Sequence, residues 1–257
     1  MEVHHHTHSP SNTASHRGKI KWSHYLWEFL MLFLAVFCGF LAENQREHYI
    51  EHQREKQFMR SMIEDLQSDT VELGKAIAKS KLIAKYADSV VIFLRAYKPE
   101  NTLPTAFTVN SGKAGLLQSI IHTDRTSSQL KNSGAMRLIR NKKVNEMIMA
   151  YWKQIEEINI SLQRYMLYRN ASRELAFTLF VLPEIYVAGT GMPVDSLQNA
   201  VKEIRIIDND PKKWDRLNNY VAMSGFLSRG VHSRNLELQL EMAKDLMATI
   251  KEEYNFK

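Results

Sequence analysis

The stretch YLWEFLMLFLAVFCGFLA at residues 25–42 decides how this chain is organised. From Phe29 onward it contains only apolar side chains and Gly39, and its single charge, Glu28, lies near its start. An apolar run of about 18 residues or more is long enough to cross a bilayer as a helix. Amphipathic aromatic residues, which favour lipid headgroups, mark its first edge: Trp22, Tyr25 and Trp27. The sequence therefore predicts a transmembrane helix over residues 20–42.

Three other interpretations of this stretch each conflict with a feature of the sequence. A cleaved signal peptide needs a small-x-small cleavage site, whose first position is filled here by the large ring of Phe40. A lipoprotein signal needs small residues before its cysteine, but Phe37 precedes Cys38. A helix buried in a soluble protein would leave the flanking aromatic and basic residues unexplained. We therefore expect an uncleaved single-pass anchor.

Basic residues near the two edges of the anchor indicate its orientation. Arg17, Lys19 and Lys21 lie close to the first edge, whereas most cations on the other side, up to Arg60, lie further away. Lys and Arg close to a membrane span tend to stay on its cytoplasmic side. We therefore expect a cytoplasmic N-terminus and an exported C-terminal domain.

Glu28 is the one charge inside the anchor, and two interpretations of it stay open. Ionisable groups within membranes are often functional. However, Glu28 lies at the aromatic edge with His24 one helical turn before it, and a paired interfacial carboxylate needs little desolvation.

The composition is that of a folded chain with room for one sizeable extramembrane domain. Of 257 residues, 44% are hydrophobic and 24% are charged, and ten glycines and six prolines are few enough to suit long helices. The net charge of +6 permits contact with anionic lipid, nucleic acid or an acidic protein, although scattered cations also describe an ordinary solvated surface. Cys38 is the one cysteine, so no intrachain disulfide can form.

After the anchor, apolar residues recur at helical spacing. Residues 43–60 are charge-dense with few apolar positions, which predicts a solvated helical stalk. From residue 59 to 94, apolar and small residues follow steps of four and three, close to a heptad repeat: Met59, Ile63, Leu66, Thr70, Leu73, Ile77, Ser80, Ala84, Ala87, Val91 and Leu94. Pro99 and Pro104 then predict a loop, and a short helix is expected over residues 113–122.

Helix-start signals mark two further long helices. Asn141 can cap a helix over residues 142–182, and Asp210, before a proline, can cap one over residues 212–254. No segment alternates convincingly as a strand would. The predicted fold is therefore all-α, with these parts: a disordered N-terminus (1–19), a transmembrane helix (20–42), a helical stalk (43–60) and an antiparallel helical bundle of three long helices plus short helices (61–257).

The polar N-terminus contains a short histidine tract. Neutral imidazoles suit zinc, nickel or copper, and the tract supplies four of them: His4, His5, His6 and His8. A metal-handling membrane protein is therefore the alternative function, set against adventitious metal binding by a histidine-rich tail. No resident cofactor is predicted.

Five basic residues surround the Gly134 turn and the predicted start of the helix over residues 142–182: Lys131, Arg137, Arg140, Lys142 and Lys143. Free backbone N–H groups at a helix start attract anions, and Arg and Lys bind carboxylates and phosphates. A small anionic ligand or the acidic face of a partner protein could bind here, unless the cluster is simply a charged surface turn. Nucleic acid is not expected, because export would separate the cluster from it.

Recognisable catalytic motifs are missing from the sequence. Residues 128–131 (SQLK) match S-x-x-K, but the two companion motifs of that acyl-transferase class are absent. Residues 189–191 (GTG) lack the Lys-Ser/Thr ending of a phosphate loop. Isolated histidines such as His122 and His232 are more often structural than catalytic. We therefore expect a protein that is not an enzyme.

Two blocks of residues carry a family resemblance. The first follows MEVHHH and comprises LxEFLM (26–31), LAV (34–36) and GFxAENxRE (39–47). The second joins QLKNSG (129–134) to RLI (137–139). Both resemble a family of uncharacterised bacterial single-pass membrane proteins with a histidine-rich N-terminus. The resemblance implies a membrane anchor with a helical domain and brings no established activity, ligand or catalytic residue.

Together these features predict a non-enzymatic interaction or sensing module of the bacterial inner membrane. Its C-terminal domain is expected in the periplasm. Its expected partners are the lipid bilayer and either another protein or a second copy of the chain, paired through the stalk.

Overall fold

A computed structural model describes residues 22–96, 102–116, 119–181 and 203–256 of the chain. The predictions for the disordered N-terminus and its histidine tract fall outside these residues. The chain divides into two compact units, Met1–His52 and Gln53–Lys257.

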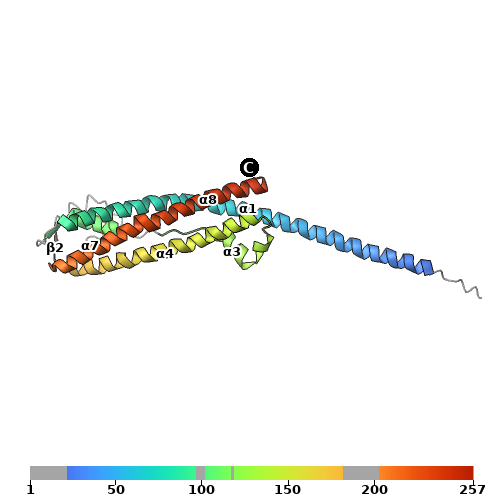
Figure 1. Cartoon of the computed structure of the whole chain (residues 1–257), viewed down its shortest axis with the longest axis horizontal. Coiled ribbons are helices and arrows are strands. Elements are labelled where there is room, and N and C mark those ends of the chain that lie inside the picture. The colour runs from blue at the N-terminus through green and yellow to red at the C-terminus, as the bar shows by residue number, and fades with distance from the viewer. Residues whose placement is uncertain (1–21, 97–101, 117–118, 182–202, 257) are drawn as a thin grey trace, which may run out of the picture. The chain divides into compact units, whose positions relative to one another are not determined.

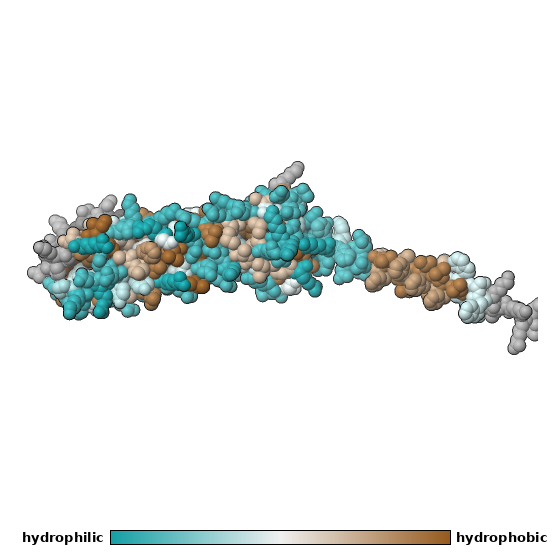
Figure 2. All heavy atoms as spheres, in the orientation of Figure 1, coloured by the Kyte–Doolittle hydropathy of each residue, from teal (hydrophilic) through white to brown (hydrophobic). Residues whose placement is uncertain are grey.

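In the first unit, helix α1 (Trp22–Ala96) carries the apolar stretch. Among the described residues, α1 is the one helix long and apolar enough to cross a membrane, and none of its 18-residue apolar window is buried. Large side chains along it, such as Phe29, Leu32 and Phe40, are 64%, 68% and 68% exposed. Figure 2 shows this part of α1 as a continuous apolar surface.

In the second unit, burial along α1 starts earlier than expected. The sequence predicts a solvated stalk up to residue 60, but Glu55 and Met59 are already buried. Phe58 and Met59 pack into the core that the second unit forms around them. The division between the two units accordingly lies between His52 and Gln53.

Three long helical segments build the second unit, in agreement with the predicted all-α fold (Figure 1). They are α1 from residue 53 onward, α4 (Lys142–Leu179), and the run of α7 (Pro211–Phe226), the π-helix η2 (Leu227–His232) and α8 (Ser233–Tyr254). Both predicted caps are confirmed. The Asn141 side chain accepts the Val144 N–H at 3.1 Å, and the Asp210 side chain accepts the Lys212 N–H at 3.0 Å.

The contacts between these segments fix their directions. At one end, Met59 of α1 lies in the same core cluster as Val144 of α4 and Ile250 of α8. At the other end, a second cluster joins the late part of each of α1 and α4 to α7, through Val90, Leu179 and Trp214. Helices α1 and α4 therefore run in the same direction, and only the α7–α8 segment runs antiparallel to them.

The parallel pair requires the chain to return along the bundle between the end of α1 and the start of α4. Short elements lie on this connection: β1 (Thr102–Pro104), α2 (Thr105–Ala114), α3 (Arg125–Asn132) and the 3-10 helix η1 (Ala135–Leu138). Pro104 directly precedes α2, so the predicted loop around the prolines ends sooner than expected, and the helix expected over residues 113–122 lies earlier in the chain.

A short pairing of strands was not predicted. Strand β1 pairs antiparallel with β2 (Glu203–Arg205), with Leu103 opposite Ile204, and Phe180 forms an isolated bridge with Ile206. Strands of three residues are too short to display an alternating pattern in the sequence.

The third long segment approaches α1 closely where α7 meets η2. A Cβ atom on Gly225 would lie 2.9 Å from the Ala87 Cβ, so glycine is needed for this contact. Directly after it, the backbone widens into the six-residue π-helix. Reciprocal hydrogen bonds join Ser80 of α1 to Ser228 of η2: each hydroxyl contacts the backbone carbonyl of the other residue, at 2.9 and 3.0 Å.

Candidate functional site

The most polar part of the core lies where the returning segment, residues 115–116 and 119–141, runs between α1 and α4. Three carboxylates of α1 point toward it although each is almost fully buried: Glu55 (2% exposed), Asp65 (3%) and Asp69 (2%). Burying a charge is unfavourable unless it is paired and hydrogen-bonded. The contacts of these carboxylates therefore explain their position.

Each of the three carboxylates accepts a backbone N–H from the returning segment. The Arg140 N–H donates to Glu55 at 2.7 Å, the Thr126 N–H to Asp65 at 2.9 Å and the Thr123 N–H to Asp69 at 2.8 Å. A side chain also donates to one of these carboxylates: the Tyr254 hydroxyl donates to Glu55 at 2.7 Å. Backbone donors in the core that no helix or strand pairs need such partners.

Side chains of helix α4 donate hydrogen bonds to backbone carbonyls of the same connection. The Tyr165 hydroxyl donates to the carbonyl of Leu116 at 2.6 Å and to that of Ala114 at 3.2 Å. The Arg169 guanidinium donates to the Gly115 carbonyl. Burial raises the pKa of Tyr165 to about 12, so the hydroxyl keeps its proton at neutral pH. Acceptors on α1 and donors on α4 thus hold opposite polar groups of one chain segment.

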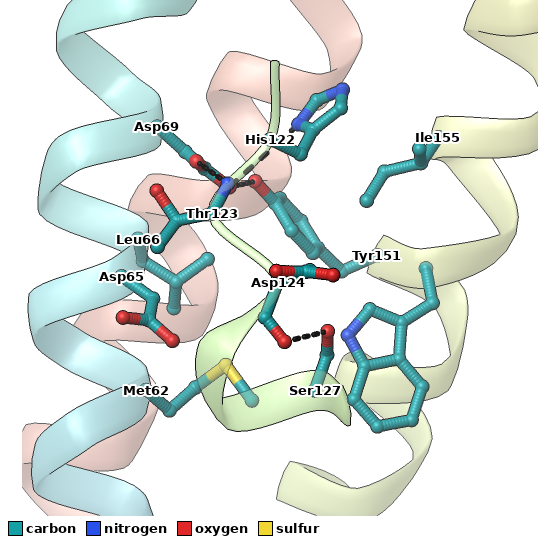
Figure 3. A pocket seen from close by; sticks show the side chains of 11 residues that line it. Met62, Asp65, Leu66, Asp69, His122, Thr123, Asp124, Ser127, Tyr151 and Ile155 are labelled. Carbon is teal, nitrogen blue, oxygen red and sulfur yellow. Dashed lines mark hydrogen bonds and ion pairs between the residues drawn. The ribbon is translucent and has the colours of Figure 1, made fainter. Parts of the chain in front are cut away.

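Asp69 is the centre of this arrangement (Figure 3). Besides the Thr123 N–H, it accepts the Tyr151 hydroxyl at 2.7 Å, and its Oδ2 lies 3.7 Å from Nδ1 of His122. Burial disfavours the charged carboxylate, but its interactions with His122, Thr123 and Tyr151 outweigh burial and hold the pKa of Asp69 below its usual range. Burial, followed by the negative charge of Asp69, raises the pKa of Tyr151. The pair is therefore a carboxylate with a protonated phenol as donor.

A small cavity of about 40 Å³ adjoins Asp69. Space of this size suits about one water molecule. Eleven residues line it: Met62, Asp65, Leu66, Asp69, His122, Thr123, Asp124, Ser127, Tyr151, Trp152 and Ile155.

The polar groups around the cavity do not assemble a nucleophile with a base. Asp69, His122 and Ser127 are residue types that some hydrolases combine. Here the Ser127 hydroxyl donates to the Asp124 carbonyl at 3.0 Å, and no hydrogen bond joins it to His122 within the described parts of the chain. The same residues contain no group of three or more His, Cys, Asp or Glu side chains placed to hold a metal ion. Instead, these groups hold the returning segment in place. We call the three buried carboxylates, Tyr151 and the backbone N–H groups bound by the carboxylates the clasp.

The five basic residues predicted as an anion site are all exposed at the end of the bundle where α4 begins: Lys131, Arg137, Arg140, Lys142 and Lys143. Lys131 lies with its Nζ 4.3 Å from the centre of the Trp152 ring, a cation–π contact. Gly134 has φ +66°, the left-handed conformation that a turn after α3 requires. The structure therefore brings the predicted residues to one surface.

One of the predicted helix-start donors already has an acceptor within the protein, because the side chain of Asn141 takes the Val144 N–H. Just before the helix, Glu55 takes the Arg140 N–H. Lys142 also has a carboxylate nearby, since its Nζ lies 3.7 Å from Glu146. Part of the predicted donor set is thus used within the bundle.

Glu28 lies on the exposed apolar part of α1, in the first unit. The His24 and Tyr25 rings lie 6.4 Å apart at the same edge.

Sequence reasoning missed the three buried carboxylates. The signal was present, because Asp69 lies three residues after Leu66 and four before Leu73, on the face of those two seam residues and next to Thr70, which the predicted seam uses. Asp65 and Glu55 occupy the adjoining face. Charged residues on the buried face of a helix indicate a polar partner in the core, which here is the backbone of the returning segment.

Comparison of the chain with protein-family models, with curated proteins and with solved structures finds no match. The family resemblance of the anchor block and the central block therefore stays a prediction.

Proposed function

We propose that this chain is a single-pass protein of the bacterial inner membrane whose helical bundle serves interaction or sensing without catalysis. One observation carries the proposal: the apolar window of α1 is entirely unburied within the chain. Contiguous apolar surface of this kind is rare on soluble monomers and needs a cover. A bilayer core of about 30 Å requires roughly 20 apolar residues, which matches the length of this stretch.

The flanking residues support a bilayer as that cover. Trp22 and Tyr25 lie at the first edge, where amphipathic rings favour headgroups, and the charged residues from Glu43 onward begin directly after the last apolar residue. The cations before the anchor favour a cytoplasmic N-terminus, which would put the bundle in the periplasm.

The proposed interaction role is supported by the hydrogen bonds that hold the returning segment. Three buried carboxylates of α1 and the Tyr165 hydroxyl of α4 are used in holding the returning segment between the two helices. A role in protein contacts, with another protein or a second copy of the chain, agrees with this use of the core. Size measurement of the detergent-solubilised chain tests it, because a strict monomer with no co-purifying protein would contradict it.

Fusion of a reporter after Lys257 tests the anchor and its orientation together. An alkaline phosphatase fusion, active only outside the cytoplasm, should be active, and a fluorescent-protein fusion, which folds only in the cytoplasm, should be dark. The reverse pair of results, with the protein still in the membrane fraction, would contradict the exported bundle. Recovery of either fusion in the soluble fraction would contradict the anchor.

A further inference from the structure

The end of the second unit at which the chain enters it carries an excess of basic side chains. This basic end comprises residues 53–60, 131–146 and 250–256, which share one core cluster and the Tyr254–Glu55 hydrogen bond. Its cations come from α1, α4, α8 and the returning segment: Arg54, Lys56, Arg60, Lys131, Arg137, Arg140, Lys142, Lys143 and Lys251. Its carboxylates are fewer: Glu55, Glu146, Glu252 and Glu253.

Several of these carboxylates are already engaged. Glu55 is buried and accepts the Arg140 N–H and the Tyr254 hydroxyl, and Glu253 accepts the Asn141 side-chain amide at 2.7 Å. By contrast, Arg54, Arg137 and Lys143 are exposed, and none of them has a carboxylate within 4 Å in the described ranges.

Ring contacts hold two other cations of the basic end in place. The Arg60 guanidinium lies 5.1 Å from the centre of the Phe256 ring, and Lys131 lies over Trp152. A cation over a ring keeps its charge, so both still add to the positive surface. The basic end therefore presents uncompensated positive charge.

A short connection joins this surface to the proposed anchor. Ten residues, 43–52, separate the apolar stretch from Gln53. Even fully extended, a connection of this length reaches at most about 35 Å. The connection therefore keeps the basic end within a short reach of the bilayer that would hold the anchor.

We infer that the basic end binds the anionic headgroups of the bilayer that holds the chain's own anchor. This inference rests on the proposed membrane anchoring. Arg137 and Lys143 would contact phosphate groups, for which the Arg fork and the Lys ammonium are suited. The tether favours lipid over an acidic protein, because it keeps the headgroups near the basic end at all times.

The opposite end of the bundle provides a matched comparison. It also contains cations, but Lys213 pairs with Asp208 and Arg229 pairs with Asp88. It lies at the far end of α1 from Gln53, where Val90 packs with Leu179 and Trp214. Exposed cations there, Lys85, Lys212 and Arg216, can be neutralised with the same change in net charge.

The test uses the full chain, with Cys38→Ser and one dye on Asn132→Cys, an exposed position beside the Gly134 turn. The labelled protein is reconstituted into vesicles of phosphatidylcholine alone or mixed with phosphatidylglycerol, with a quencher on some headgroups. Three neutralised residues define the test variant, Arg137→Gln, Lys142→Gln and Lys143→Gln. The control variant is Lys85→Gln, Lys212→Gln and Arg216→Gln. Resistance to carbonate extraction is measured on the same vesicles.

We expect stronger quenching with phosphatidylglycerol than without it, and loss of the difference in high salt. The test variant should weaken the headgroup-bound state on the order of 100-fold, since each cation near an anionic surface contributes a roughly fivefold preference, whereas the control variant should behave like the wild type. Equal quenching in both lipid mixtures, or an unaffected test variant, would overturn the lipid contact while carbonate resistance leaves the anchor standing. Release of the protein by carbonate would overturn both.

Discussion

Replacing Asp69 by alanine tests the clasp around the returning segment most severely. The Asp69 carboxylate is 2% exposed and accepts the Thr123 N–H at 2.8 Å and the Tyr151 hydroxyl at 2.7 Å. Asp69→Ala leaves both donors buried without these partners. A hydrogen bond to a charged acceptor contributes about 1.5–3 kcal/mol. Removing the buried charge also removes its desolvation cost, which offsets part of the loss of the two hydrogen bonds.

We therefore expect Asp69→Ala to lower the free energy of unfolding of the bundle by about 3 kcal/mol. For a domain of this size, each kcal/mol corresponds to roughly 2–4 °C, so the midpoint should fall by roughly 6–12 °C. Circular dichroism of the full chain in detergent micelles measures both quantities, by thermal and by urea unfolding.

Two further variants test whether the loss of stability comes from the buried contacts of Asp69. Tyr151→Phe removes the phenol and keeps the ring, so a double-mutant cycle with Asp69→Ala should give a coupling energy of about 1–3 kcal/mol. Asp88→Ala is the matched control, because Asp88 forms an exposed ion pair with Arg229, and such pairs contribute about 1 kcal/mol or less. If Asp69→Ala cost no more than Asp88→Ala, the buried carboxylates would not hold the returning segment.

The remaining predictions concern pH and close packing. Because the pKa of folded Asp69 is lowered from 3.8, its stabilisation is present above about pH 4 and is lost as the pH falls through the folded-state pKa, so wild type and Asp69→Ala should converge in an acid unfolding series. Tyr165→Phe should lower the free energy of unfolding by about 1–3 kcal/mol at neutral pH. Because the folded-state pKa of Tyr165 is raised to about 12, this advantage of the wild type is complete below pH 10. It disappears as the pH rises through 12, which alkaline urea titrations would reveal. Gly225→Ala should destabilise the bundle by about 1–3 kcal/mol, because the new Cβ meets the Ala87 Cβ at 2.9 Å, and Ala87→Gly should restore much of the loss in the same unfolding assay.

Much of the fold could be predicted because helical periodicity is a local property of the sequence. The seam on α1 contains residues that are buried in the structure, including Met59, Leu66 and Leu73, and the Asn141 and Asp210 caps both lie where their side-chain chemistry indicated. What the pattern could not predict was direction. An apolar face is equally apolar whichever way its helix runs, so the parallel α1–α4 pair depends on a connection whose path no local signal describes.

The candidate site divides in the same way. The basic residues around Gly134 could be grouped from sequence because they are neighbours along the chain. The clasp could not, since Asp69, Thr123 and Tyr151 are far apart in sequence and meet only when the returning segment is in place. The heptad position of Asp69 was the one local sign that a charge would be buried.

Alkaline carbonate extraction of membranes containing the full chain tests the central claim, that the unburied apolar stretch of α1 lies in a bilayer. The wild type should stay in the membrane pellet. Leu34→Lys with Phe37→Lys should move the chain to the supernatant, because each charge near the middle of a span costs about 2.5–3.5 kcal/mol. Val71→Lys with Leu82→Lys, at exposed apolar positions of the bundle, should stay with the membrane. Release of the wild type, or retention of the Leu34→Lys, Phe37→Lys variant to the same extent, would contradict the anchor.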